Sequence, residues 1–152
     1  MDIPEDYLKL EKKYKGLPEW KWLSTNFRVK LENGGLVEQV RHSVSEKLDN
    51  VSHSLIEPII GPGESYCCWF ERKMITDTDR DELFNIYRQL QALIWRSNKI
   101  SITESEKDFA EWLIRVEKEW EGLRPALEKF CMKLEEGWLK YKKPIESTSY
   151  HG

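Results

Sequence analysis

The residues best suited to catalysis or metal binding are histidines and carboxylates that recur every three or four positions along one segment. They are Glu38, His42, Glu46, Asp49, His53 and Glu57. On a helix these six side chains share one stripe, and imidazoles with carboxylates at this spacing can hold a divalent metal. The apolar seam between Val37 and Leu55, however, has its centre about 190° around the same helix. Because metal sites in helical bundles use inward-facing residues, we expect a solvated face, no metal site and no cofactor.

Two adjacent cysteines follow a turn that contains glycines. Residues 61–68 place Cys67 and Cys68 in the first turns of a predicted helix, where the helix dipole would lower a thiol pKa. Such a site could supply a nucleophile or bind an anion. Arg72 follows Cys67, but no glycine lies between them to wrap a phosphate, and the Lys-Ser/Thr ending of a P-loop is absent. Free cysteines are usually buried, so we predict that Cys67, Cys68 and Cys131 lie in the core. We therefore expect no catalytic residue.

Seven tryptophans are the compositional anomaly of the chain. Four of them fall on or beside predicted buried stripes, where a large ring fills the space between helices: Trp69, Trp112, Trp120 and Trp138. Trp20 and Trp22 are two positions apart and cannot share one helix face, and Trp95 lies off the centre of its stripe. At least one of these three rings is expected to be exposed, and exposed aromatic rings dominate binding hot spots. Trp20, Trp22 and Trp95 are therefore the predicted binding residues, and the alternative is that all seven tryptophans pack inside the protein.

The charge balance and hydropathy exclude several classes of protein. The chain carries 24 Lys and Arg against 27 Asp and Glu, with the two signs interleaved. This balance argues against a nucleic-acid partner. A helical nucleic-acid binder that uses residues 9–15 or Arg72 and Lys73 is kept as a weaker functional alternative. No apolar run approaches the ~18 residues of a membrane span, and the acidic start lacks the apolar core of a signal peptide. We therefore expect a cytoplasmic protein with no membrane segment and with reduced thiols.

Apolar positions recur at the spacing of a buried helical stripe over most of the chain. From Leu36 onward this pattern predicts five helices, over residues 36–57, 64–75, 79–99, 103–122 and 125–141. Residues 76–79 offer several possible N-caps for the third of these helices, and Asp79 and Glu82 have the spacing of a capping box. Gly122 and Pro125 suit the end of one helix and the start of the next. The last two helices are therefore predicted to form an antiparallel hairpin.

The first third of the chain has a less regular pattern. Residues 4–15 and 18–31 predict two shorter helices. Phe27, Val29 and Leu31 also alternate as residues of a strand do, and an Asn-Gly pair follows them. The strand is the weaker alternative because the residues after position 35 follow helical spacing, which leaves a hairpin without its second arm.

These patterns predict an all-α fold, namely an antiparallel bundle of about five to seven helices with no substantial sheet. Residues 1–144 are expected to form a single helical domain, and residues 145–152 a flexible tail. We expect a non-catalytic module for protein–protein interaction, whose partner is another protein or a further copy of the chain. The alternative is a small-molecule or metal-dependent enzyme with a pocket between the helices, to which Cys67, Cys68, His42 or His53 would contribute.

Overall fold

The computed structural model describes residues 2–63 and 65–141, and every regular element in these two stretches is a helix. The predicted all-α fold is confirmed. In chain order the elements are α1 (Glu5–Lys13), α2 (Trp20–Phe27), α3 (Leu36–Asn50), the π-helix η1 (Val51–Ile56), α4 (Glu57–Ile60), α5 (Tyr66–Met74), α6 (Asp77–Thr103) and α7 (Glu106–Leu139). The predicted tail, residues 145–152, lies outside the described residues.

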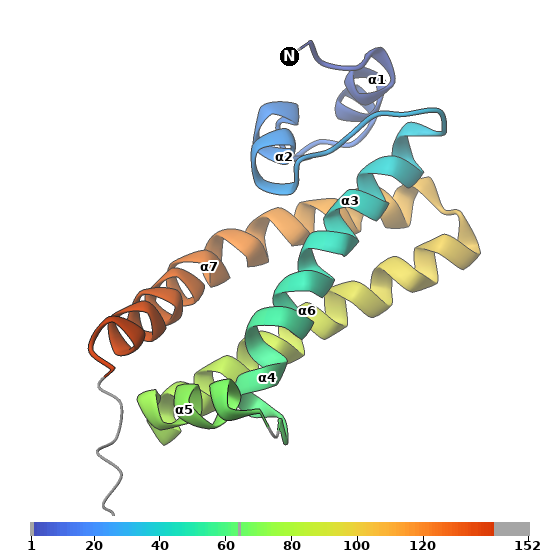
Figure 1. Ribbon diagram of the computed structural model, residues 1–152. Helices are drawn as coiled ribbons and strands as arrows, with labels where there is room; N and C mark the ends of the chain where they lie inside the picture. The colour runs from blue at the N-terminus through green and yellow to red at the C-terminus, as the bar shows by residue number, and fades with distance from the viewer. Residues whose placement is uncertain (1, 64, 142–152) are drawn as a thin grey trace, which may run out of the picture.

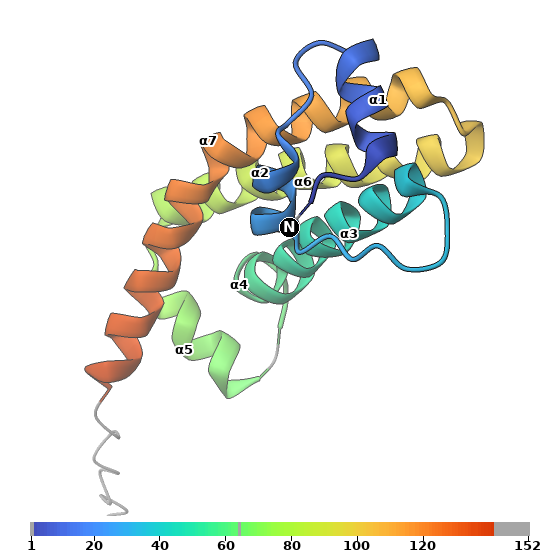
Figure 2. The same cartoon turned by 90° about the horizontal axis from the view of Figure 1, so that it is seen from above.

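Three long helical segments form the body of the molecule. The segments α3, η1 and α4 follow one another without a break and make a single rod. Figure 1 shows α6 and α7 as a long antiparallel hairpin with this rod packed across it. Figure 2 shows α1 and α2 over one part of the hairpin, and α5 at the far end beside the second half of α7. The two ends of the hairpin therefore carry different short helices.

The hydrophobic core lies where the rod meets the α6–α7 hairpin. Its most deeply buried aliphatic and aromatic residues come from all three segments: Val40, Val44, Leu48, Ile56, Leu83, Leu90, Leu93, Phe109, Trp112, Leu113 and Val116. Each fully buried side chain of this kind stabilises the fold by about 1.5–3 kcal/mol relative to its exposed state. The single indole nitrogen of Trp112 is also satisfied, because it donates to the carbonyl of Leu93 at 3.0 Å. These contacts fix the relative positions of the three segments.

The rod does not end before Pro58, as the sequence predicts, but continues to Ile60. Proline has no amide hydrogen to donate to the carbonyl four residues before it, and the chain forms a π-helix just ahead of it. In this stretch the amide of Glu57 bonds to the carbonyl of Ser52. The wider turn rotates the apolar seam, so Ile56 is fully buried and the predicted seam residue Leu55 is exposed.

The predicted break between Gly122 and Pro125 is wrong, because α7 is one helix of 34 residues that contains both. Leu123 and Leu127, on either side of the proline, are buried in the core. Their burial outweighs the local cost of a proline inside a helix, about 3 kcal/mol. Figure 2 shows the axis of α7 turning in its second half, as an internal proline makes a helix do. The antiparallel neighbour of α7 is thus α6.

The ends of α6 also differ from the prediction. The helix begins at Asp77 with Thr76, one of the expected N-cap candidates, as its N-cap, and the capping box pairs Thr76 with Asp79 rather than Asp79 with Glu82. It continues past Asn98 to Thr103 and ends at Glu104, which takes the left-handed conformation with φ 52°. This extension adds about one turn that the sequence prediction assigns to a loop, and in it Ile100 is buried while residues 101–103 are exposed.

Residues 28–35 are neither the predicted helix nor the alternative strand. Arg28 takes the left-handed conformation and ends α2 at Phe27. The side chain of Gln39 then holds the connection, because it accepts from the amide of Glu32 at 2.6 Å and donates to its carbonyl at 3.0 Å. A side chain on α3 therefore supplies the hydrogen bonds that a second strand would have given.

Candidate functional site

The outer face of α6 carries three large apolar side chains that contact no core. Phe84, Trp95 and Ile102 are 51%, 69% and 83% exposed. Their spacing of eleven and seven residues brings them within about 20° of one another around the helix. The centre of the buried side of α6, which includes Leu90 and Leu93, lies roughly 150° away. We call Phe84, Trp95 and Ile102 the α6 stripe.

Charged side chains accompany the α6 stripe on one flank. Asp81 and Lys99 are separated by 18 residues, which is about five helical turns, so both lie on the same flank. Arg88 lies on this flank between them. All three are exposed, and none forms an ion pair within the described ranges 2–63 and 65–141. Their charges are available to a partner.

Of the three predicted binding tryptophans, Trp95 is the one that is clearly exposed. Trp20 is only 2% exposed, and its ring lies 5.0 Å from that of Tyr7. The expectation that at least one of the three is exposed is met by Trp95, whereas Trp20 is buried because Tyr7 of α1 packs against it. Trp22 is half-buried, with its ring edge-on to Phe27 at 5.5 Å. The short-range sequence pattern could not reveal this cover, which comes from a separate helix.

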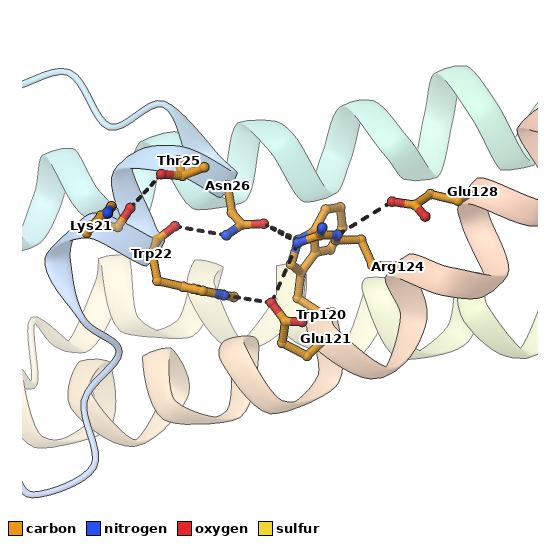
Figure 3. A network of polar contacts seen from close by, with 8 residues as sticks. All are labelled: Lys21, Trp22, Thr25, Asn26, Trp120, Glu121, Arg124 and Glu128. Atoms are coloured by element: carbon orange, nitrogen blue, oxygen red, sulfur yellow. Dashed lines mark hydrogen bonds and ion pairs between the residues drawn. The ribbon is translucent and has the colours of Figure 1, made fainter.

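The side chain of Trp22 belongs to a polar network that fastens α2 to α7 (Figure 3). Its Nε1 donates to Glu121 at 2.6 Å. Next to it, the Oδ1 of Asn26 accepts from the indole of Trp120 at 3.2 Å and from Arg124 at 3.1 Å. The amide nitrogen of Asn26 donates back to the carbonyl of Trp22 at 2.9 Å. These contacts give Trp22 a structural role in holding α2.

A second exposed aromatic surface lies where α5 meets the end of α7. Its rings are Tyr66, Trp69, Phe70, Trp138 and Tyr141. Trp69 and Trp138 are 48% and 37% exposed, which makes their predicted burial wrong, whereas the predicted burial of Trp112 and Trp120 is confirmed. The ammonium of Lys73 lies 3.6 Å from the centre of the Trp69 ring, and the indole of Trp138 donates to Glu71 at 3.0 Å. Partners within the chain thus already engage these two rings.

The histidine and carboxylate stripe points into solvent, as the sequence predicts. Its six residues, Glu38, His42, Glu46, Asp49, His53 and Glu57, are all exposed. His53 contacts Glu57 through Nδ1 and Asp49 through Nε2, the latter at 3.1 Å, so neither ring nitrogen is free for a metal. The hydrogen bond to Glu57 raises the pKa of His53 above its ordinary value. Among the residues described, no group of three or more His, Cys, Asp or Glu could hold a metal ion.

The predicted burial of the cysteines is wrong, since Cys67 and Cys131 are exposed and Cys68 is half-buried. The helix α5 lies at the end of the bundle and buries none of its residues completely. Partial desolvation and the nearby carboxylate of Glu71 raise the pKa of Cys67. A nucleophilic thiol needs the opposite shift. Cys67 therefore lacks the shift of an activated nucleophile.

A polar surface groove of about 840 Å³ lies between residues 26–34 and α3. Charges of both signs line it, and it includes His42 of the histidine and carboxylate stripe. It lies between a loop and one helix rather than between core helices, and none of the three cysteines lines it. The catalytic side chains of the enzyme alternative are thus not brought together here.

Phe84 and Ile102 are binding candidates that the sequence prediction misses. The signal that could have found them is the position of Phe84, Trp95 and Ile102 on one line, opposite the stripe that begins at Leu83.

Comparisons of the chain with protein-family models, curated proteins and solved structures found no match. In residues 2–63 and 65–141, no helix combines the length and apolar character needed to cross a lipid bilayer. Function must therefore be inferred from the exposed surface itself.

Proposed function

We propose that the chain is a protein-interaction module that binds its partner on the α6 stripe. The observation that supports this is Trp95, which is 69% exposed on the outer side of a helix whose inner side is fully packed. An indole side chain of about 200 Å² left mostly in water forgoes on the order of 3 kcal/mol of hydrophobic stabilisation. A partner that covers Trp95 would recover this free energy.

The stripe is presented on a rigid support. Gln91, which lies between Phe84 and Trp95 on the same side of α6, donates to Ser52 at 2.7 Å, and on the buried side the hydroxyl of Ser97 lies 2.6 Å from that of Ser45. Arg41 also donates to Ser97 at 3.2 Å. These bonds hold α6 in register against the rod, so little ordering entropy is lost when a partner binds. A straight helix face with apolar residues at such spacing suits a partner helix.

We further propose that the protein acts in the cytoplasm. Cys67 and Cys131 are exposed and are not joined in a disulfide. Exposed free thiols are kept reduced in a cytosolic environment, whereas an oxidising compartment would favour disulfides between molecules. This feature supports the cytoplasmic location.

Site-specific photo-crosslinking in cells tests the docking proposal. A photoreactive phenylalanine analogue is placed at Trp95 or at Phe84, and, as a matched control, at Gln89, which is exposed on the same helix about 130° away. We expect a discrete protein adduct from positions 95 and 84 and none from position 89. Absence of adducts at both stripe positions, or equal adducts at the control position, would contradict the proposal.

A further inference from the structure

We infer that the partner on the α6 stripe is a second copy of the chain, bound so that the two α6 helices run antiparallel. This inference rests on the proposed function and names its partner. It is carried by four residues on the exposed face of α6 whose order is complementary to itself when reversed: Phe84, Trp95, Asp81 and Lys99.

Two of the three apolar residues of the stripe match in this arrangement, whereas Ile102 falls opposite Asp77 of the other copy and gains no apolar partner. A two-fold axis that passes midway between Phe84 and Trp95 places Phe84 of each copy opposite Trp95 of the other. Both residues lie near the centre line of the exposed face, so two identical pairs of aromatic rings form across the axis. Edge-to-face or offset contacts between such rings add to the free energy of burial.

The charged flank matches on the same axis. Asp81 lies three residues before Phe84, and Lys99 lies four residues after Trp95. Two-fold antiparallel helices bring the same flank of each helix together, so Asp81 of each copy faces Lys99 of the other. In a parallel two-fold pair the opposite flanks of the helices meet instead, so Asp81 and Lys99 would not face each other. The pairing of Asp81 with Lys99 therefore requires the antiparallel orientation.

Close to the axis, Arg88 has an acceptor on the other copy. Gln91 uses its Nε2 to donate to Ser52, and no partner for its Oε1 occurs among the described residues. That oxygen can accept from Arg88 of the second copy. The two Arg88 side chains approach each other near the axis and repel, which weakens the contact.

The segment from Phe84 to Ile102 spans about 27 Å, so we expect a small interface and a dissociation constant in roughly the micromolar range.

Sedimentation equilibrium of the full chain measures this association. Between about 5 and 500 µM, we expect the average mass to rise from 18.2 kDa toward twice that value. Trp95→Glu should weaken the association roughly hundredfold, because it removes an apolar contact on both sides of the axis. Trp69→Glu is the matched control, since Trp69 is also an exposed tryptophan but lies on α5, and it should leave the association unchanged. Circular dichroism confirms that both variants remain helical.

A charge exchange tests the antiparallel pairing directly. Asp81→Lys creates two Lys–Lys contacts in the dimer, and Lys99→Asp creates two Asp–Asp contacts, so each variant alone should associate about tenfold more weakly. An equimolar mixture of the two variants restores both ion pairs in a heterodimer and should regain the wild-type association. A mixture that stays as weak as its components would overturn the pairing.

The outcomes separate this inference from the proposed function. A chain that stays at 18.2 kDa at the highest concentration, or a dimer that Trp95→Glu leaves intact, overturns the second copy as partner. If the crosslinked adduct at position 95 then contains a different protein, the docking function of the stripe stands without self-association. If positions 95 and 84 give no adduct either, both proposals fail.

Discussion

The indole nitrogen of Trp120 donates to the side-chain oxygen of Asn26, which lies 94 residues earlier in the chain. Trp120 is buried against Phe27, with ring centres 5.5 Å apart, so this donor has little access to water. Arg124 donates to the same oxygen. A single amide on α2 therefore satisfies two donors on α7, and this makes Asn26 the residue on which the docking of α2 most depends.

Replacing Asn26 with Ala should lower the free energy of unfolding by about 1–3 kcal/mol, because the buried indole donor of Trp120 loses its acceptor. Urea denaturation followed by tryptophan fluorescence measures the change. Thr25→Ala is the control, since Thr25 is exposed and bonds only to the carbonyl of Lys21 in its own helix. We expect that variant to stay within about 0.5 kcal/mol of wild type. Equal effects of the two substitutions would show that the Asn26 contacts do not hold α2.

Two glycines inside α7 offer a matched comparison. A Cβ at Gly122 would meet nothing within 4 Å, whereas a Cβ at Gly137 would clash with the Sδ of Met74 on α5. Gly122→Ala should therefore stabilise the protein by about 0.5–1 kcal/mol, the usual gain in a helix. Gly137→Ala should lose that gain and displace α5. Thermal unfolding compares the two variants, and an equal rise in Tm for both would show that Met74 does not pack closely on Gly137.

The buried stripes are the part of the fold that sequence reasoning predicts well. Leu83, Ile86, Leu90 and Leu93 are all buried as expected, because a repeat of about 3.6 residues reflects which side of a helix packs. Local signals fail where a distant segment decides the outcome. Pro125 does not end α7, because the core contacts around it come from other parts of the chain and outweigh the local cost.

The candidate site is predictable only in part for the same reason. Trp95 is exposed because its own helix turns it outward, which helical spacing can indicate. The burial of Trp20 depends on Tyr7 of α1, and the exposure of Trp69 depends on the position of α5 at the end of the bundle. Neither placement follows from the residues near that tryptophan. Tertiary packing therefore decides which aromatic rings remain on the surface.

Acid stability should depend on the ion pair between Asp79 and Lys133, which joins the start of α6 to α7. The hydrogen bond from Lys133, followed by that from the backbone of Thr76, lowers the pKa of Asp79 from 3.8 to about 2. A carboxylate with a lowered pKa in the folded state stabilises the protein fully above its unfolded pKa. This contribution is lost as the pH falls from about 4 through about 2.

Replacing Asp79 with Asn tests this dependence, because the amide can still cap the helix but carries no charge. We expect wild type to exceed the variant by about 1 kcal/mol in free energy of unfolding near pH 6, and the difference to shrink as the pH falls below about 4. Denaturant titrations over this range provide the measurement. Asp77→Asn is the control, since the side chain of Asp77 is 98% exposed and its ion pair with Arg80 lies within one helix. A wild-type advantage that persists unchanged to pH 2 would show that the charge of Asp79 does not contribute to stability.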